Sequence, residues 1–190
     1  MDFQEGGRTL PPRERFTREM IIDAAYQIYL ESGMNVVTTR AIAQAMGGST
    51  QPIFSQFATL DDVRAAVLDK AISSFSSKHH QDFNDPDALL LISKHLIETV
   101  TENPHLLHSL SLNTMLGTSE TYQEGKMKLL HQLMNVHQLT EKNANMLYMI
   151  IFGETIGILF AANHEQLENP TMFYRFLNQI YYTLLKDLKP

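Results

Sequence analysis

The sequence predicts an all-α fold, and three observations support that prediction. Apolar residues recur at helical spacing, as in Met20, Ile21, Ala24, Ala25 and Ile28, because positions three and four apart share one helix face. No segment alternates between apolar and polar residues as a half-buried strand does. No repeat of fixed length is present, which argues against a solenoid or a propeller. We expect three short helices followed by about six longer ones.

Caps and breaks set the expected bounds of the first helices. Ser and Thr side chains accept hydrogen bonds at helix starts, and Gly ends helices because it tolerates positive φ. Residues 1–12 form a flexible leader that contains Gly and Pro pairs. The first predicted helix runs from a Thr17 cap to Ser32-Gly33, with Gly33 in the left-handed conformation. A helix over 40–46, capped by Thr38 or Thr39, and a helix over 50–57, capped by Ser49, are joined by a Gly47-Gly48 turn. The next helix begins at a Thr59 cap and runs to about Lys78.

The rest of the chain is divided by the same signals. Asn84-Asp85-Pro86 and Gly117-Thr118-Ser119 are breaks, and Pro104 suits the first position of a helix. The expected helices are about 87–102, one that begins at 104, 120–136, 141–163 and 171–188. We therefore expect two domains after the leader, one over residues 13–60 and one over residues 61–190.

Composition excludes several classes of protein. The 190 residues are 44% hydrophobic and 19% charged, which is ordinary for a folded chain and excludes a disordered one. The chain has no cysteine, which excludes disulfide scaffolds, cysteine-ligated zinc or iron–sulfur sites and thiol catalysis. The polar N-terminus lacks the apolar core of a signal peptide, and we expect a cytoplasmic protein.

The longest apolar stretch is Met146–Ala162. It contains Glu154 and is about one helical turn shorter than a comfortable membrane span, so we predict a buried helix and no membrane partner. An unpaired buried carboxylate is costly. Glu154 would therefore bond across a dimer or point into a ligand pocket.

Charge is distributed unevenly along the chain. The formal net charge of −6 argues against a non-specific nucleic-acid coat. Residues 8–60 hold five Arg and four acids, whereas residues 71–190 hold eight basic and twelve acidic groups. A polyanion such as DNA would therefore meet the N-terminal third.

Residues 38–57 carry the main functional signal. Two short helices joined by a Gly turn, each with one apolar face, form a helix-turn-helix pattern. Ile42, Met46, Ile53 and Phe57 would pin the pair to the first helix. Gln can read adenine with two hydrogen bonds, and Ser or Thr can reach base edges or phosphates. Side chains of these types face outward on the second short helix, together with one proline. The outward residues are Thr50, Gln51, Pro52, Ser55 and Gln56.

The alternative is two packed helices with no DNA role, and the apolar positions fit both interpretations. The outer face favours DNA, because no acid occurs from Ala41 to Leu60 and the outward groups are short and polar. An ordinary solvated helix more often carries Glu and Lys together.

Arg18 to Leu68 resembles the DNA-binding domain of the TetR/AcrR family of transcriptional repressors. The matching positions are Thr38-Thr39, Ile42-Ala43, Gly47, Ser49, Ile53-Phe54 and Phe57, followed by Thr59-Leu60-Asp61-Asp62-Val63. The resemblance implies a dimer that leaves a palindromic operator when a small effector binds. It implies DNA contacts from Arg18, Thr38, Thr39, Arg40, Ser49, Thr50, Gln51, Pro52, Phe54, Ser55 and Gln56.

Two departures from the family pattern bear on affinity. Phe54 replaces a usual Tyr and keeps its packing but loses a hydroxyl that often touches phosphate, and no Lys follows at Ala58, Thr59 or Leu60. Fewer phosphate contacts give a shallower dependence on salt. The N-terminal arginines would either enter a minor groove or form a solvated face, and they are Arg8, Arg13, Arg15 and Arg18.

The family resemblance places an effector pocket among the helices of residues 62–137. Met and aromatic side chains make adaptable apolar cavities, although plain core is the commoner role for each. The candidate lining residues are Phe75, Leu91, His95, Leu107, Leu110, Met115, Met127, Leu130 and Met134, with Glu154 as a further candidate. They predict an apolar or amphipathic effector.

The last two helices are expected to form the dimer interface. Met146–Ala162 is apolar nearly all round, which is more than one monomer face needs. Gly153 and Gly157 would let another helix approach, or would mark a local kink. The expected interface residues are Ile150, Gly153, Gly157, Phe160, Phe173, Leu177, Ile180, Tyr181 and Leu184.

Other functions have weaker support in the sequence. Glu102, His105 and His108 have metal-ligand spacing, but Asn103-Pro104 breaks the helix between them, so no metal or other cofactor is predicted. No nucleophile–base pair or phosphate-binding Gly loop is present, so we predict no enzyme. The alternatives are an activator, a regulator that answers to a partner protein, or a helical small-molecule-binding module or enzyme without a DNA role.

Overall fold

The computed structural model describes residues 16–107, 119–165 and 170–189. Within these residues the chain is helical and has no strand, which confirms the predicted fold class. The elements are α1 (Arg18–Ser32), η1 (Met34–Val36), α2 (Thr39–Ala45), α3 (Gln51–Gln56), α4 (Leu60–Lys78), η2 (Asp82–Asn84), α5 (Ala88–Glu102), α7 (Glu120–His137), α8 (Glu141–Glu165) and α9 (Pro170–Leu188).

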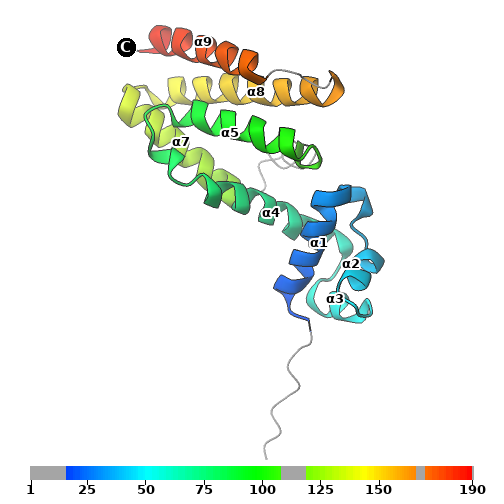
Figure 1. The fold of residues 1–190 in the computed structure, drawn as a ribbon. Coiled ribbons are helices and arrows are strands. Elements are labelled where there is room, and N and C mark those ends of the chain that lie inside the picture. The colour runs from blue at the N-terminus through cyan, green and yellow to red at the C-terminus, as the bar shows by residue number, and fades with distance from the viewer. Residues whose placement is uncertain (1–15, 108–118, 166–169, 190) are drawn as a thin grey trace, which may run out of the picture.

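Figure 1 shows the helices in two blocks. α1, α2 and α3 lie together at one end, and α4 leads from them to a larger block of α5, α7, α8 and α9. α8 and α9 run side by side in opposite directions. The domain boundary predicted at residue 60 falls on the first residue of α4, the helix that joins the two blocks.

Three threonines begin helices as predicted. The hydroxyls of Thr17 and Thr38 accept hydrogen bonds from the backbone N–H three residues later, at 3.3 and 3.1 Å. Thr59 and Asp62 form a capping box, in which the Thr59 hydroxyl accepts from the Asp62 N–H at 3.1 Å and the Asp62 carboxylate accepts from the Thr59 N–H at 2.8 Å. The starts of α1, α2 and α4 are therefore fixed by local chemistry.

Two predicted caps need correction. Gly33 ends α1 with φ 81°, but its ψ of 170° lies outside the left-handed helical region, so the chain leaves in an extended direction. Ser49 does not cap α3. The N-cap is Thr50, which has a helical backbone and no side-chain capping bond. Pro52 lies in the first turn of α3, where its missing N–H has no intrahelical partner to lose.

The helix expected after Pro104 is helical at residues 105–107, and its remainder lies outside the described residues. The same holds for residues 117 and 118 of the predicted Gly117 loop, whereas Ser119 caps α7 by accepting a hydrogen bond from the Tyr122 N–H at 3.4 Å. The starts and ends of α5, α7, α8 and α9 lie within two residues of the predicted bounds.

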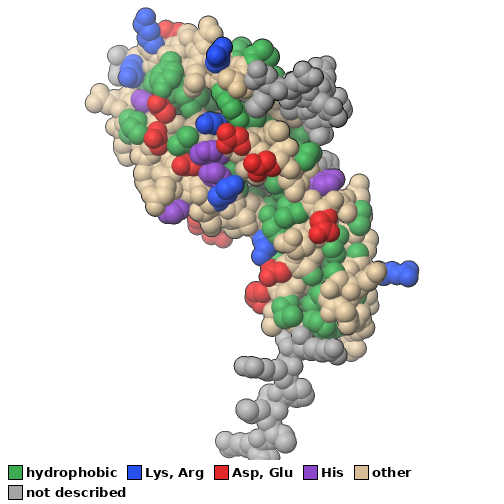
Figure 2. Space-filling model, viewed as in Figure 1, with side chains coloured by type: hydrophobic (Ala, Val, Ile, Leu, Met, Phe, Trp, Pro, Cys, Tyr) green, Lys and Arg blue, Asp and Glu red, His purple; other side chains and the backbone are tan. Residues whose placement is uncertain are grey.

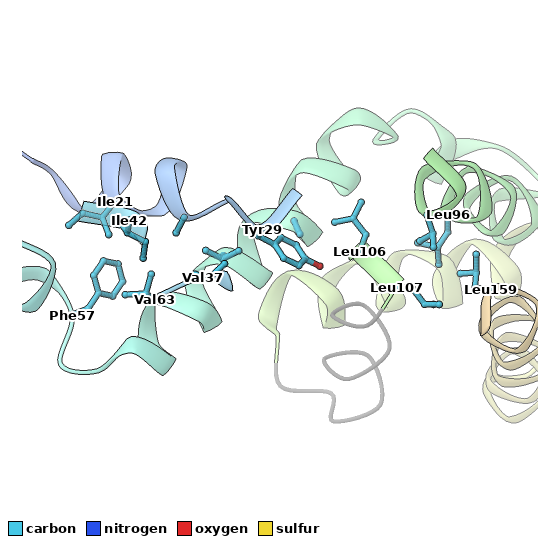
Figure 3. Close-up of a cluster of buried hydrophobic side chains, with 14 of the residues drawn as sticks. Ile21, Tyr29, Val37, Ile42, Phe57, Val63, Leu96, Leu106, Leu107 and Leu159 are labelled. Atoms are coloured by element: carbon cyan, nitrogen blue, oxygen red, sulfur yellow. The ribbon is translucent and has the colours of Figure 1, made fainter. Parts of the chain in front are cut away.

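One hydrophobic cluster runs through both blocks (Figure 3). Its buried members come from α1, α2 and α3, from α4, and from α5, α8 and α9, and they include Ile21, Ile42, Ile53, Phe57, Val63, Val67, Leu96, Leu107 and Leu159. A second cluster around Leu147, Ile151 and Tyr181 holds α5, α7, α8 and α9 together. The helix-turn-helix block is therefore joined to the larger block by continuous packing.

α8 is long and apolar enough to span a membrane by length and composition. In the fold it packs against α5, α7 and α9, and it buries Leu147, Tyr148, Ile151 and Leu159. The predicted burial therefore holds for one side of α8 only, because 39% of the apolar window is buried and the opposite side is exposed in the isolated chain. Glu154 faces outward and is exposed in the isolated chain.

Candidate nucleic-acid interface and effector cavity

α3 presents an uncharged outer face. Gln51, Phe54 and Ser55 are exposed, whereas Ile53 on the opposite side is 1% exposed and packs into the core. The end of the molecule that carries α2 and α3 shows few charged side chains in the view of Figure 2. An exposed face of this kind, with amide and hydroxyl groups, suits hydrogen bonding to base edges.

The turn between α2 and α3 sets the direction of that face. Gly47 has φ 65°, a conformation that strains other residues. The Gly48 N–H donates to the Ala43 carbonyl at 2.9 Å and closes the end of α2. The Phe16 ring lies so close to Gly48 that an added Cβ would come within 2.9 Å of it. A side chain at position 48 would therefore displace this ring.

Arg18 holds the C-terminal end of α3. Its Nη1 donates to the Gln56 carbonyl at 3.0 Å, and its guanidinium lies 3.9 Å from the centroid of the Phe57 ring. The last carbonyls of a helix lack intrahelical partners, so this bond satisfies one of them. Arg18 was predicted to contact DNA, and the structure also gives it a role in positioning α3.

The remaining predicted DNA-binding residues gather at the same end of the molecule. Arg40 and Ser49 are exposed, whereas Thr38, Thr39, Thr50, Pro52 and Gln56 are partly buried. The Ser55 hydroxyl donates to the Pro52 carbonyl at 2.7 Å and keeps its lone pairs for a further donor.

Phe54 departs from the packing expected of it. It is 56% exposed, because α3 turns Ile53 and Phe57 inward and the residue after Ile53 then points away from the core. The aromatic ring belongs to the outer face, where it can make an apolar contact such as that with a thymine methyl group.

A second feature is a cavity of about 700 Å³, including its open mouth, between α4, α5, α7 and α8. The wall is almost entirely apolar, and its apolar members are Ile72, Phe75, Phe83, Leu89, Ile92, Leu96, Leu129 and Phe152.

Few polar groups line this cavity. The hydroxyls of Tyr122 and Tyr148 lie 2.7 Å apart in a hydrogen bond, and the Lys126 ammonium lies 5.6 Å from the Tyr148 ring centroid. Burial raises the pKa of both phenols, so both are neutral at pH 7. Since the pair uses one of its two O–H hydrogens, the other can be donated to a ligand.

Most of the predicted lining residues lie elsewhere. Phe75 lines the cavity. Leu91 lines a separate hollow between α5 and α9, and His95 lies against Asp82. The others are corrected as follows: Leu107, Leu130 and Met134 belong to the core clusters, Met127 and Glu154 are exposed, and Leu110 and Met115 lie outside the described residues.

The face that α7 turns to the cavity explains these corrections. The lining residues of α7 are Thr121, Tyr122, Gly125, Lys126 and Leu129, which follow one another at helical spacing. Met127, Leu130 and Met134 lie on other faces of α7. The sequence signal that was missed is Gly125, a small residue three positions after Tyr122. Both residues line the cavity, and Gly125 has no side chain to fill it.

An apolar outer face covers α8 and α9. We call this the α8–α9 face, and its exposed members are Met146, Met149, Phe160, Met172 and Phe176. Gly153 and Gly157 lie on the same side of α8, with nothing within 4 Å of the position of an added Cβ. The face is therefore both apolar and open to another helix.

The predicted interface residues divide between this face and the interior. Gly153, Gly157 and Phe160 are exposed, and Ile150 is half-buried. Leu177 and Tyr181 are 2% and 0% exposed because they pack into the core of their own chain, which corrects their assignment to the surface. Phe173, Ile180 and Leu184 are partly buried against the same cores. The outward residue Met172 was missed, because periodicity does not say whether an apolar stripe faces its own core or a partner.

α4 joins the two candidate sites. Its first half packs Val63 and Val67 against the α1 core, and Arg64 Nη2 donates to the Val37 carbonyl at 3.2 Å. Its second half supplies Ile72, Phe75 and Ser76 to the cavity. The same helix therefore lines the cavity and packs against α1.

Comparison with known proteins gives a match in structure alone. No family model and no curated protein sequence matches the chain. A TetR transcription regulator from Haloarcula marismortui is 22% identical with a TM-score of 0.61, over 90% of this chain and 97% of that chain. A TetR variant from Acinetobacter baumannii in complex with minocycline is 14% identical with a TM-score of 0.65, over 90% and 96%.

A third similar structure is the TetR family repressor AlkX from a Dietzia species. It is 17% identical with a TM-score of 0.57, over 92% of this chain and all of that chain. All three matches extend over nearly the whole length of both chains. The chain has the fold of the TetR-family transcription regulators.

Proposed function

We propose that this protein is a cytoplasmic, dimeric transcriptional repressor that leaves a palindromic operator when a small apolar or amphipathic effector binds. The observation that carries the proposal is the outer face of α3, where Gln51, Phe54 and Ser55 are exposed and uncharged on a helix-turn-helix scaffold. Solvated helices normally carry charge on such a face. Base recognition gives a reason for its absence.

The effector site in this proposal is the cavity between α4, α5, α7 and α8. Its apolar wall favours an apolar body, and the Tyr122–Tyr148 pair favours one hydrogen-bond acceptor on the ligand. The Lys126 ammonium beside Tyr148 would favour an acceptor that is polar or anionic. The minocycline complex of the similar structure supports a small-molecule role for this fold.

The dimer would form through the α8–α9 face. Large exposed apolar patches are uncommon on monomers and mark interaction surfaces. The two exposed glycines of α8 allow close helix contact. Two-fold symmetry would present two copies of α3 to two half-sites about one helical turn of DNA apart or a little more.

Release would follow from the position of α4. An effector that displaces Ile72 or Phe75 shifts a helix whose other half packs on α1. Two α3 helices whose separation changes no longer match the operator. This is a coupling free energy between two sites and needs no contact between effector and DNA.

Selection from random duplex DNA tests the proposal. The ligand-free protein, refolded from denaturant to remove any bound effector, should enrich a palindrome. The double variant Gln51→Ala with Ser55→Ala should lose the sequence preference, whereas Gln27→Ala, an exposed glutamine of α1, should retain it. Failure of the refolded protein to enrich any site at low salt would refute the proposal. The enriched palindrome would then be located in genomic DNA. A position upstream of the promoter elements rather than across them would indicate an activator.

A further inference from the structure

We propose that His79, Asp82 and His95 form a binding site for a divalent first-row transition metal ion. The inference is independent of the proposed function. Asp82 Oδ2 lies 3.0 Å from His79 Nδ1 and 2.8 Å from His95 Nδ1, and the three ligand atoms lie within 4.8 Å of one another. Two imidazoles and a carboxylate are the donor set that Zn²⁺ and its neighbours prefer.

The three side chains come from separate elements that the fold brings together. His79 follows the last residue of α4, Asp82 begins η2, and the Asp82 N–H donates to the His79 carbonyl at 3.0 Å. His95 lies on α5, and its ring stacks on that of His79 with centroids 4.3 Å apart. The donor atoms are thus placed before any ion arrives, which lowers the cost of binding.

Burial distinguishes this cluster from a chance surface group. The side chains of His79, Asp82 and His95 are only 10%, 20% and 22% exposed. His79 Nε2 and His95 Nδ1 are buried without a hydrogen-bond partner in the described part of the chain, although the latter lies close to the carboxylate. Buried polar atoms without partners are costly. A metal bond at His95 Nδ1 would remove one of these costs.

The distances also fit a common metal centre. The Asp82 carboxylate oxygen is 2.8 Å from the His95 nitrogen and 3.0 Å from the His79 nitrogen. With an ion about 2.1 Å from each donor, the corresponding donor–metal–donor angles would be roughly 84° and 91°. These angles suit octahedral coordination with water in the open positions. Tetrahedral Zn²⁺ would need donors about 3.4 Å apart, which requires an opening of about half an ångström.

The site would clamp the C-terminal end of α4 onto α5. The ring of Phe75, which lines the cavity, lies 4.7 Å from the ring of His79. A bound ion would therefore stiffen the cavity wall from behind. Metal binding would stabilise the whole chain by mass action, because the unfolded chain does not hold these three donors together.

Calorimetric titration of the untagged, chelator-treated full chain with ZnCl₂, NiCl₂ and CoCl₂ tests the inference. We expect one equivalent bound, a rise in melting temperature, and for Co²⁺ an absorption spectrum with nitrogen and oxygen ligation. Asp82→Asn and His95→Gln, which keep side-chain size, should each weaken binding by more than about tenfold, since even outer-shell changes at metal sites have such effects. His80→Ala and His131→Ala, both exposed, should bind as the unchanged protein does.

Three results would overturn the inference. One is a wild-type chain that binds none of the three ions. Another is an Asp82→Asn chain, shown by circular dichroism to be folded, that binds as tightly as wild type. The third is binding that depends on His80 or His131 instead. In the first case the three side chains form a hydrogen-bonded cluster only.

Discussion

Two phenylalanines three residues apart, Phe54 within α3 and Phe57 at its C-cap, should differ strongly in their response to the same substitution. Phe57 is 3% exposed and lies in the cluster that joins α1, α2 and α4, whereas Phe54 is 56% exposed on the outer face. Replacing a buried Phe by Ala costs about 3–5 kcal/mol. Phe57→Ala would also remove the ring beneath the Arg18 guanidinium, 3.9 Å away.

The expected cost at Phe54 is much smaller. Full burial of a Phe contributes about 1.5–3 kcal/mol, and this side chain is less than half buried, so Phe54→Ala should cost about 1 kcal/mol or less. The free energy of unfolding should be measured by urea titration of both variants with a shared slope. In binding to the selected duplex, Phe54→Ala should weaken affinity while the protein remains folded.

Equal destabilisation by the two substitutions would refute the assigned orientation of α3. A Phe54→Ala variant with unchanged stability and unchanged DNA affinity would show that the outer face of α3 is not the recognition surface. The pair separates these outcomes because the two residues have the same side chain and lie three positions apart at the end of α3.

Three further predictions test other parts of the account. Thr59→Ala removes the hydroxyl of the capping box and should cost about 1 kcal/mol, seen as a fall of roughly 2–4 °C in melting temperature; an unchanged melting temperature would contradict the cap. Met149→Arg on the α8–α9 face, at a residue 70% exposed in the isolated chain, should give a folded monomer in light scattering, whereas Met127→Arg on α7 should remain a dimer. Tyr182 donates a hydrogen bond to Asp87, which with partial burial raises its pKa to about 12. Because the folded chain keeps this proton after the unfolded chain begins to lose it near pH 10.0, stability should fall from about pH 10 to pH 12. Tyr182→Phe should show a shallower fall in urea titrations across that range, and an equal slope would count against the bond.

The fold could be predicted because its signals are local. Thr17, Thr38 and Thr59 begin helices through bonds to backbone groups three residues away, and such bonds depend only on sequence spacing. Local spacing misplaced the start of α3. Ser49 fits the sequence pattern of a cap, but Thr50 is the N-cap residue in the structure and has a helical backbone.

The cavity and the dimer face could be predicted only in part. An apolar stripe such as Leu177 with Tyr181 looks the same whether it meets its own core or a second chain. Met127 and Leu130 belong to α7, which lines the cavity, but they lie on faces of α7 that do not point into it. The His79, Asp82 and His95 cluster was missed because η2 and α5 bring together residues separated by a loop.

The spacing of the two helix-turn-helix blocks in the dimer is the most direct test of the proposed function. Because the chain has no cysteine, Ala45→Cys, at the exposed end of α2, accepts one spin label per protomer. Pulsed dipolar spectroscopy on the dimer bound to the selected duplex should give one narrow distance within a few ångströms of about 34–36 Å, one turn of DNA, or slightly longer. The absence of any distance between labels, or a distance that the duplex leaves unchanged and that matches no half-site spacing, would contradict the account.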